Sequence, residues 1–68
     1  MNGTVKNNIL LNKEFDQVQF DFALKYSALD IDVSNWTLGV EHIIGDDGST
    51  ISGGQRARIA LARCLYQE

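Results

Sequence analysis

Four consecutive residues have the types and the spacing to bind an anion: Ser52, Gly53, Gly54 and Gln55. A serine and a glutamine three residues apart, at the start of a helix-forming run, make a capping box. The N-terminus of a helix presents unpaired N–H groups and a partial positive charge. Two glycines leave these N–H groups uncovered, so phosphate oxygens can approach the backbone closely. The segment therefore predicts a phosphate site, with the Ser52 hydroxyl as a further donor.

Other interpretations of this region are open at this point. The four residues could do no more than cap the helix, because capping boxes are common. The tail could instead dock as a helix in a partner's groove, as a protein–protein interaction module with no nucleotide role. Arg56 and Arg58 would raise the positive potential beside a phosphate, but with Arg63 they could also lie on the recognition helix of a helix-turn-helix DNA-binding protein. The acidic balance of the chain and its glycine-rich cap disfavour DNA binding.

Size and composition limit the chain to one small domain. It has 68 residues with one cysteine and one histidine, so it can form neither an internal disulfide nor a zinc site. The net charge of −3 argues against nucleic-acid binding, which needs a basic surface. No apolar run approaches the roughly 20 residues that span a bilayer. Residues 1–6 lack the apolar segment of a signal peptide, so none is expected.

The first half of the chain predicts two helices. Thr4 can cap a short helix over Thr4–Leu11, which Asn12 can stop. A longer helix is expected over Lys13–Tyr26, because apolar residues recur there at spacings of three and four. We expect this stripe to be packed core, which is the usual meaning of such a pattern. Its members are Phe15, Val18, Phe22 and Tyr26, continued by Leu29.

The middle of the chain is less regular. A further helical turn over Asp30–Trp36 could be capped by Asp30 or by Asp32. The β-branched residues of Thr37–Ile44 could form a short extended piece. Gly45–Thr50 is a loop by composition.

The last predicted helix, Gln55–Tyr66, is apolar on most sides. We therefore expect it to be buried on most sides, including at Cys64. A chain of 68 residues can hardly enclose it, which predicts neighbours outside this sequence. Exposed apolar surface would also favour self-association of the chain. Together the elements predict an all-α fold, a small helical subdomain of three to four helices.

The longer string from Ile51 to Arg63 closely resembles the signature motif of ATP-binding cassette (ABC) transporters and the helix that follows it. The family pattern is LSGGQ, a basic residue and an apolar helix with an Ala-Arg pair; Ile51 replaces the leucine. Residues 45–48 resemble the glycine-bracketed acidic loop ahead of the signature in exporters. Asp46 keeps the acid there, whereas Asp47 stands in place of the usual basic residue. Gly3–Ile9 resembles the G-T-[IV]-x-x-N-I segment that follows the glutamine loop.

The resemblance covers nearly the whole chain and is nearest to exporters of the multidrug-resistance-associated C subfamily. It implies that residues 1–68 are the helical subdomain of a nucleotide-binding domain, an incomplete part of an α/β P-loop ATPase domain. Residues 1–11 would lie next to the glutamine loop, and residues 45–66 would form the signature loop and its helix.

The resemblance also implies a role for each site residue. Two nucleotide-binding domains close head to tail around ATP, and each signature meets the γ-phosphate held by the opposite Walker A loop. Ser52 would donate its hydroxyl, while Gly53 and Gly54 would offer backbone N–H groups. Gln55 would sit near the nucleotide or orient the loop. Asp46 would lie near the coupling surface that faces the membrane domain.

The partners implied are the second nucleotide-binding domain, the core ATPase subdomain and the coupling helices of a transmembrane domain, at the cytoplasmic face of a membrane. Nucleic acid is not among them. The cofactor is ATP, with Mg²⁺ supplied by the opposite domain's site. The 68 residues contain neither a GxxxxGK[ST] phosphate loop nor the acidic strand that would follow the signature helix. We therefore expect no catalytic residue, no metal ligand and no ATPase activity in the chain alone. The parent protein would hydrolyse ATP; a non-transport ABC ATPase of DNA repair or translation is the alternative within the family.

Overall fold

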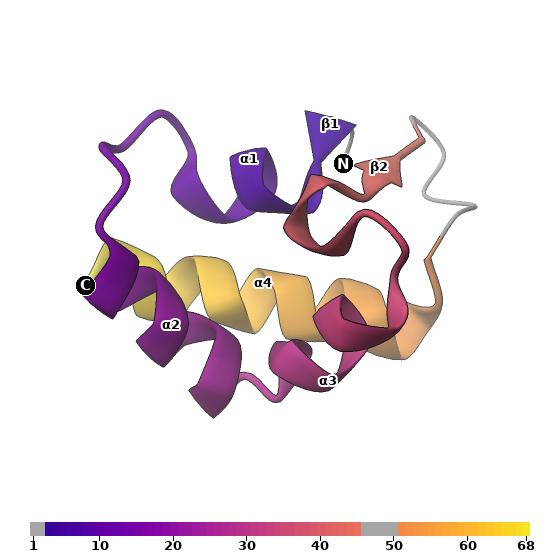
Figure 1. The fold of residues 1–68 in the computed structure, drawn as a ribbon. Helices are drawn as coiled ribbons and strands as arrows, with labels where there is room; N and C mark the ends of the chain where they lie inside the picture. The colour runs from indigo at the N-terminus through magenta and orange to yellow at the C-terminus, as the bar shows by residue number, and fades with distance from the viewer. Residues whose placement is uncertain (1–2, 46–50) are drawn as a thin grey trace.

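The computed structural model describes residues 3–45 and 51–68 and confirms the predicted all-α class, with four α-helices in that part of the chain. Its elements are β1 (Gly3–Thr4), α1 (Val5–Leu10), α2 (Gln17–Tyr26), α3 (Leu29–Asn35), the 3₁₀-helix η1 (Gly39–Glu41), β2 (Ile43–Ile44) and α4 (Gly53–Gln67). The long α4 crosses the middle of the molecule, with α1 on one side and α2 and α3 on the other (Figure 1). Most of the predicted loop, residues 46–50, lies outside the described residues.

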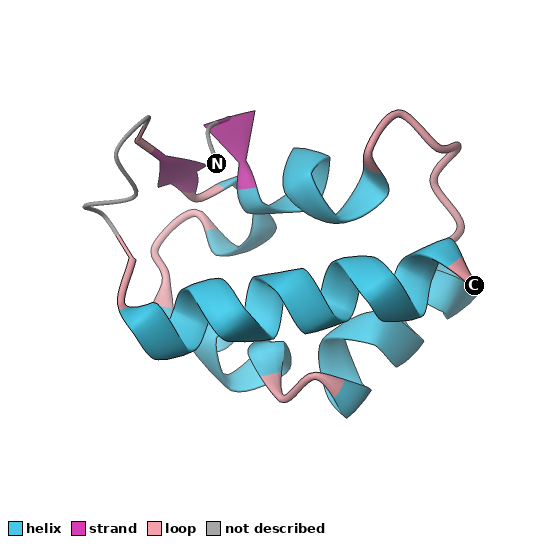
Figure 2. Cartoon of the chain, turned by 180° about the vertical axis from the view of Figure 1, so that it is seen from behind, coloured by secondary structure: helices cyan, strands magenta, loops and turns pink. Residues whose placement is uncertain are grey.

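The helix α4 is the element around which the others pack. Its buried residues, Ile59, Ala62 and Tyr66, recur at spacings of three and four and therefore share one face. Seen from behind, α4 lies in front, with α1 and the short strands above it (Figure 2). Its last turn is tied to α1 because the side-chain amide of Gln67 donates to the carbonyls of Ile9 and Leu10, both at 3.0 Å.

The first helix forms largely as predicted. The Thr4 hydroxyl oxygen accepts a hydrogen bond from the N–H of Asn7 at 3.0 Å, which is the predicted N-cap. Val5 and Ile9 are fully buried, and the helix ends where Leu11 enters the left-handed region at φ 47°. The extended piece predicted within residues 37–44 is present only as β2, which pairs antiparallel with β1 after the 3₁₀ turn.

The predicted core stripe on the second helix is wrong. Val18 is 81% exposed and Tyr26 is 62% exposed, and the buried residues of α2 are Phe20 and Ala23. The helix begins at Gln17 and not at Lys13, because the Asp16 carboxylate caps it by accepting from the N–H of Gln19 at 3.0 Å. Phe15 thus lies before the helix and cannot continue a helical stripe. Of the five predicted members, only Leu29 on α3 is buried.

The predicted cap of α3 is also wrong. The N-cap is Ala28, in the left-handed region at φ 63°, and no side chain bonds to it as a cap. Asp30 and Asp32 fall inside the first turn, since the helix begins one residue before Asp30. There they still favour the helix electrostatically, because carboxylates near a helix N-terminus oppose its partial positive charge. Asp32 is therefore free to bond elsewhere.

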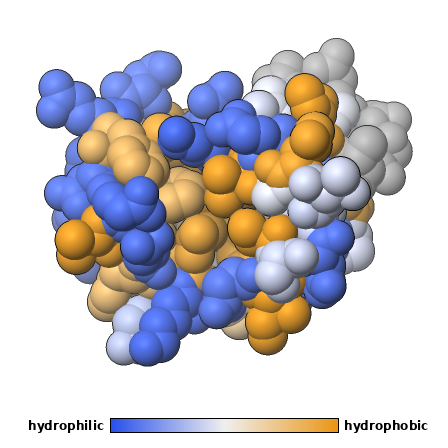
Figure 3. All heavy atoms as spheres, viewed as in Figure 1, coloured by the Kyte–Doolittle hydropathy of each residue, from blue (hydrophilic) through white to orange (hydrophobic). Residues whose placement is uncertain are grey.

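Apolar surface remains exposed on several elements. Cys64, which we expected to be buried, is exposed, and Leu61 is 47% exposed. The reason is that α1, α2 and α3 cover only the face of α4 that carries Ile59, Ala62 and Tyr66. On the side where α2 and α3 lie in front of α4, hydrophobic side chains show at the surface among hydrophilic ones (Figure 3).

Candidate functional site

The start of α4 carries the predicted capping box. The Ser52 hydroxyl oxygen accepts from the N–H of Gln55 at 3.1 Å, and the Gln55 side-chain oxygen accepts from the N–H of Ser52 at 2.9 Å. Ser52 is extended at φ −78° and ψ 167°, as an N-cap residue should be. The two reciprocal bonds hold the backbone of this segment in one conformation without covering it.

The capping box leaves two N–H groups for an outside partner. The N–H of Gln55 is taken by Ser52, and the N–H of Arg56 donates to the Ser52 carbonyl at 3.0 Å in the first helical bond. No acceptor among the described residues bonds the N–H groups of Gly53 and Gly54, and both glycines are exposed. An anion placed there would meet two bare donors at the positive end of a 15-residue helix.

The space around these glycines is asymmetric. A Cβ built on Gly53 would have no atom of the described residues within 4 Å, so it would lie in open space. A Cβ on Gly54 would lie 3.1 Å from the Arg58 guanidinium. The site is therefore open on the Gly53 side and backed by a cationic group on the Gly54 side.

Asp32 joins this site from α3. Its carboxylate accepts from Arg58 Nε at 2.7 Å, from Arg58 Nη2 at 3.1 Å and from the side-chain amide of Gln55 at 3.3 Å. The hydrogen bond from Arg58 is the main cause that lowers the pKa of Asp32 below its ordinary value, against an opposing effect of burial. Asp32 has 13% of its side chain exposed and Arg58 has 37%.

This ion pair alters one expectation from the sequence. Arg58 does not add a free positive charge beside the predicted phosphate site, because Asp32 compensates it. Arg56 is exposed at the same end of the helix, and no acidic side chain among the described residues forms an ion pair with it. Sequence spacing did not reveal Asp32 as part of the site, since it stands 26 residues before Arg58 and its neighbours carry no motif.

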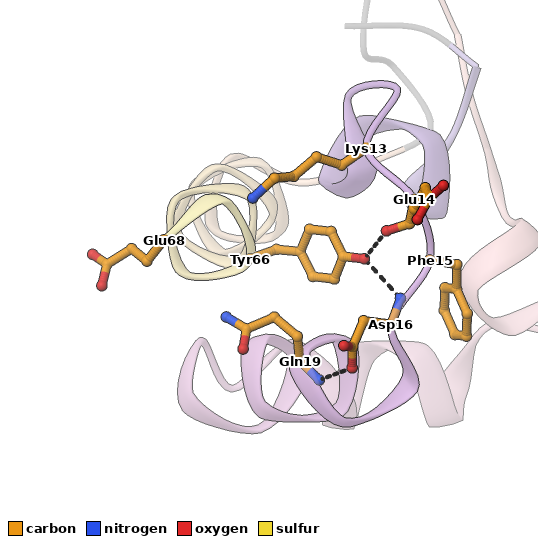
Figure 4. Close-up of a pocket in the computed structure, with 7 residues that line it drawn as sticks. All are labelled: Lys13, Glu14, Phe15, Asp16, Gln19, Tyr66 and Glu68. Carbon is orange, nitrogen blue, oxygen red and sulfur yellow. Dashed lines mark hydrogen bonds between the residues drawn. The ribbon is translucent and has the colours of Figure 1, made fainter.

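A pocket at the other end of α4 is distinct from this site. It is an open hollow of about 520 Å³ between the chain before α2 and the end of α4. Figure 4 shows the Tyr66 ring reaching the backbone there: its hydroxyl donates to the Glu14 carbonyl at 2.5 Å and accepts from the N–H of Asp16 at 2.9 Å. Fourteen residues separate Tyr66 from Ser52, which is roughly 20 Å along a helix. The pocket therefore cannot belong to the predicted phosphate site.

The described residues hold no group of three or more histidine, cysteine or acidic side chains placed to bind a metal ion. Among the same residues, no helix has the length and apolarity needed to cross a bilayer.

Relatives match almost the entire chain. "ABC transporter C family member 13" of Arabidopsis thaliana is 48% identical over 66 residues, which are 97% of this chain and 5% of the relative. "ATP-binding cassette sub-family C member 10" of Homo sapiens is 48% identical over 65 residues, which are 96% of this chain and 4% of the relative. Over nearly its whole length, the chain is therefore similar to a segment of C-family ABC transporters.

A solved structure supports the same family. The structure titled "Structure of a bacterial Atm1-family ABC exporter with ATP bound" matches with a TM-score of 0.87 and 28% identity, over 100% of this chain and 12% of the exporter chain. The resemblance to ABC exporters, and to the C subfamily among them, is thus confirmed. The chain spans 4 to 5% of the length of the two relatives named above. No protein-family profile matches it.

The structure places the four predicted site residues together at the start of α4. Asp46, predicted near the coupling surface, lies outside the described residues, as does Asp47. The residue that sequence reasoning missed is Asp32, which contacts the side chain of Gln55.

Proposed function

We propose that residues 1–68 form the helical subdomain of the nucleotide-binding domain of an ATP-driven ABC transporter, an exporter of the multidrug-resistance-associated type. Residues 1–11 follow the glutamine loop, and residues 45–66 are the signature loop and helix. Ile51–Gln55 contacts the γ-phosphate of ATP that a second nucleotide-binding domain holds, and this contact couples hydrolysis to transport.

One observation supports this proposal above others: the capping box fixes the start of α4, and no acceptor among the described residues bonds the exposed N–H groups of Gly53 and Gly54. The Ser52 oxygen uses a lone pair for the N–H of Gln55, so its hydroxyl hydrogen is available to a phosphate oxygen. A segment that served only as a cap would not need two glycines, since glycine at helical positions is less favourable than alanine.

The chemistry of the chain is electrostatic positioning. Backbone N–H groups and a hydroxyl can stabilise charge on a transferring phosphoryl group, but they cannot activate water. The Walker A loop, the Mg²⁺ ligands and the catalytic base would come from the core ATPase subdomain and from the opposite domain. The parent protein, and not this chain alone, would therefore hydrolyse ATP.

The remaining partners follow from the same proposal. The subdomain would sit at the cytoplasmic face of a membrane and meet the coupling helices of a transmembrane domain. Its exposed apolar surface, including Leu61 and Cys64 on α4, would be covered there by the core subdomain.

A segment exchange tests the proposal. This chain would replace the matching 65 residues of human sub-family C member 10, and ATP hydrolysis would be measured in the purified chimera. Gly53→Asp places a carboxylate at the helix start, which suits the helix but repels phosphate. We expect a loss of turnover of about 100-fold, as when a preorganised donor site is lost.

Thr37→Asp is the matched control, because it adds the same charge at an exposed residue outside α4. We expect Thr37→Asp to leave turnover unchanged. Equal turnover in the two aspartate variants would show that Ser52–Gln55 only caps the helix, and it would refute the phosphate contact.

A further inference from the structure

We infer that Asp32 is a positioning residue for the nucleotide contact: from α3, its carboxylate holds Gln55 and Arg58 and so sets the orientation in which the start of α4 faces a phosphate. This inference rests on the proposed function of Ser52–Gln55. It adds a residue from a different helix, with no place in the signature motif, to the machinery of the site.

Asp32 accepts three hydrogen bonds from α4, two from Arg58 at 2.7 and 3.1 Å and one from the Gln55 amide at 3.3 Å. An arginine that donates through two nitrogens to one carboxylate is fixed in direction as well as in distance. The carboxylate therefore defines where the first turn of α4 lies relative to α3.

The side-chain amide of Gln55 is hydrogen-bonded at both its nitrogen and its oxygen. Its side-chain nitrogen donates to Asp32, while its side-chain oxygen accepts from the N–H of Ser52 at 2.9 Å. A continuous path of hydrogen bonds thus runs from α3 through one amide group to the N-cap residue. A change at Asp32 reaches Ser52 through a single side chain.

The guanidinium of Arg58 lies close to Gly54. Its Nη1 atom would lie 3.1 Å from a Cβ on Gly54, whereas Asp32 binds Nε and Nη2 of the same guanidinium. Asp32 thereby keeps the guanidinium behind Gly54. Without that hold, the flexible cation could fold over the exposed N–H groups or leave them altogether.

Arg63, further along α4, is a suitable control residue for the link between Arg58 and Asp32. Arg63 donates from Nε to the Asn8 carbonyl at 2.8 Å and from Nη2 to the Asn8 side chain at 3.2 Å. This arginine also joins α4 to another helix through two bonds, but it stands 11 residues after Ser52. Removal of the Arg63 guanidinium should lower the stability of the fold without changing the orientation of the start of α4.

The experiment measures ATP hydrolysis against ATP concentration in the chimera that carries this chain. We expect Asp32→Asn to lower kcat about tenfold, because small misplacements of a positioned group cost that much or more. KM for ATP should change less than about threefold, since most of the nucleotide's binding wall lies on the other domain. Asp32→Glu should recover most of kcat.

Two further variants keep the test decisive. Arg58→Lys keeps the charge but loses the two-nitrogen grip, so it should lower kcat in the same direction even if Asp32→Asn folds poorly. Arg63→Gln should leave kcat unchanged. If Arg63→Gln and Asp32→Asn lower kcat equally, Asp32 has only a structural role and the inference is overturned.

Gly53→Asp separates this inference from the proposed function. A loss of turnover in Gly53→Asp with none in Asp32→Asn would refute the role of Asp32 and leave the phosphate contact standing. No loss in either variant would refute both.

Discussion

Gly54 faces the guanidinium of Arg58 at close range: a Cβ on Gly54 would lie 3.1 Å from Nη1 and 3.7 Å from Cζ. Gly53, one residue earlier, would have nothing within 4 Å of its own Cβ. Neither glycine has a positive φ, so the backbone itself tolerates other residues at both positions. What the two glycines provide is access to the backbone, and this can be separated from stability by experiment.

Gly53→Ala should stabilise the chain. Alanine loses less conformational entropy than glycine on entering a helix, and the added methyl group meets no neighbour. We expect a gain of about 0.5 kcal/mol in the free energy of unfolding, measured by urea titration of the chain. The same variant in the chimera should lower ATP turnover, because the methyl group covers donors that the proposed function needs open.

Gly54→Ala is the companion variant and should gain less stability. Its methyl group must displace the Arg58 side chain by a few tenths of an ångström, which strains the bonds to Asp32. A larger gain for Gly54→Ala than for Gly53→Ala would contradict the close approach described above. Higher stability together with undiminished turnover in both variants would argue against backbone access as the purpose of the glycines.

Asp32→Asn should destabilise the chain in a pH-dependent way. The folded-state pKa of Asp32 is lowered, chiefly by Arg58, so the carboxylate contributes stability above its ordinary pKa of 3.8. This contribution is lost as the pH falls through the lowered pKa. Urea titrations should therefore show a stability difference between wild type and Asp32→Asn that is constant near neutral pH and shrinks below about pH 3.8. The same difference at every pH would show that charge on Asp32 is irrelevant.

Tyr66→Phe should destabilise the chain by about 1–3 kcal/mol, because it leaves the Glu14 carbonyl and the Asp16 N–H without their partner. Tyr66 is 2% exposed, and its ring packs edge-on against Phe20 at 6.0 Å. Tyr26→Phe is the control, since Tyr26 is 62% exposed and should change stability by less than about 0.5 kcal/mol. Thermal and urea unfolding would measure the stability of both variants. An equal loss of stability in the two would show that the Tyr66 hydroxyl does not stabilise the fold.

The exposed aromatic stripe of α2 should drive self-association of the chain. Phe22 and Tyr26 pack on each other at 4.7 Å between ring centroids, with Val18 one turn before them. Exposed apolar surface of this kind favours association. We expect sedimentation velocity to show oligomers that Phe22→Gln reduces, whereas Ile43→Gln, at a 60% exposed residue on β2, leaves them unchanged. A monomer at high concentration would contradict this prediction.

Local signals in the sequence predicted the starts of α1 and α4, where the hydroxyls of Thr4 and Ser52 cap the helix at a spacing of three residues. They did not predict the start of α2, which the Asp16 carboxylate caps in the same way. The start of α3, which no side chain caps, was predicted wrongly. This helix starts after Ala28, and no sequence pattern indicates the left-handed conformation of that residue.

The buried face of α2 could not be predicted in the same way. Its sequence carries two apolar sets, and the longer one, with Val18, Phe22 and Tyr26, lies at the surface. Periodicity shows that a helix has an apolar face, but it does not say which of two faces meets the neighbouring helix. Packing against α4 decided it, because Phe20 and Ala23 fit against the face that carries Ile59 and Tyr66.

The sequence by itself thus determined the helical class, the capping box and the two bare glycines, because each depends on residues within four positions of one another. Tertiary structure alone decided the partner of Arg58, since Asp32 comes from another helix 26 residues away. It also decided which apolar residues are core. A contact between two helices depends on how they pack in space, and the spacing of residues within one helix does not determine this packing.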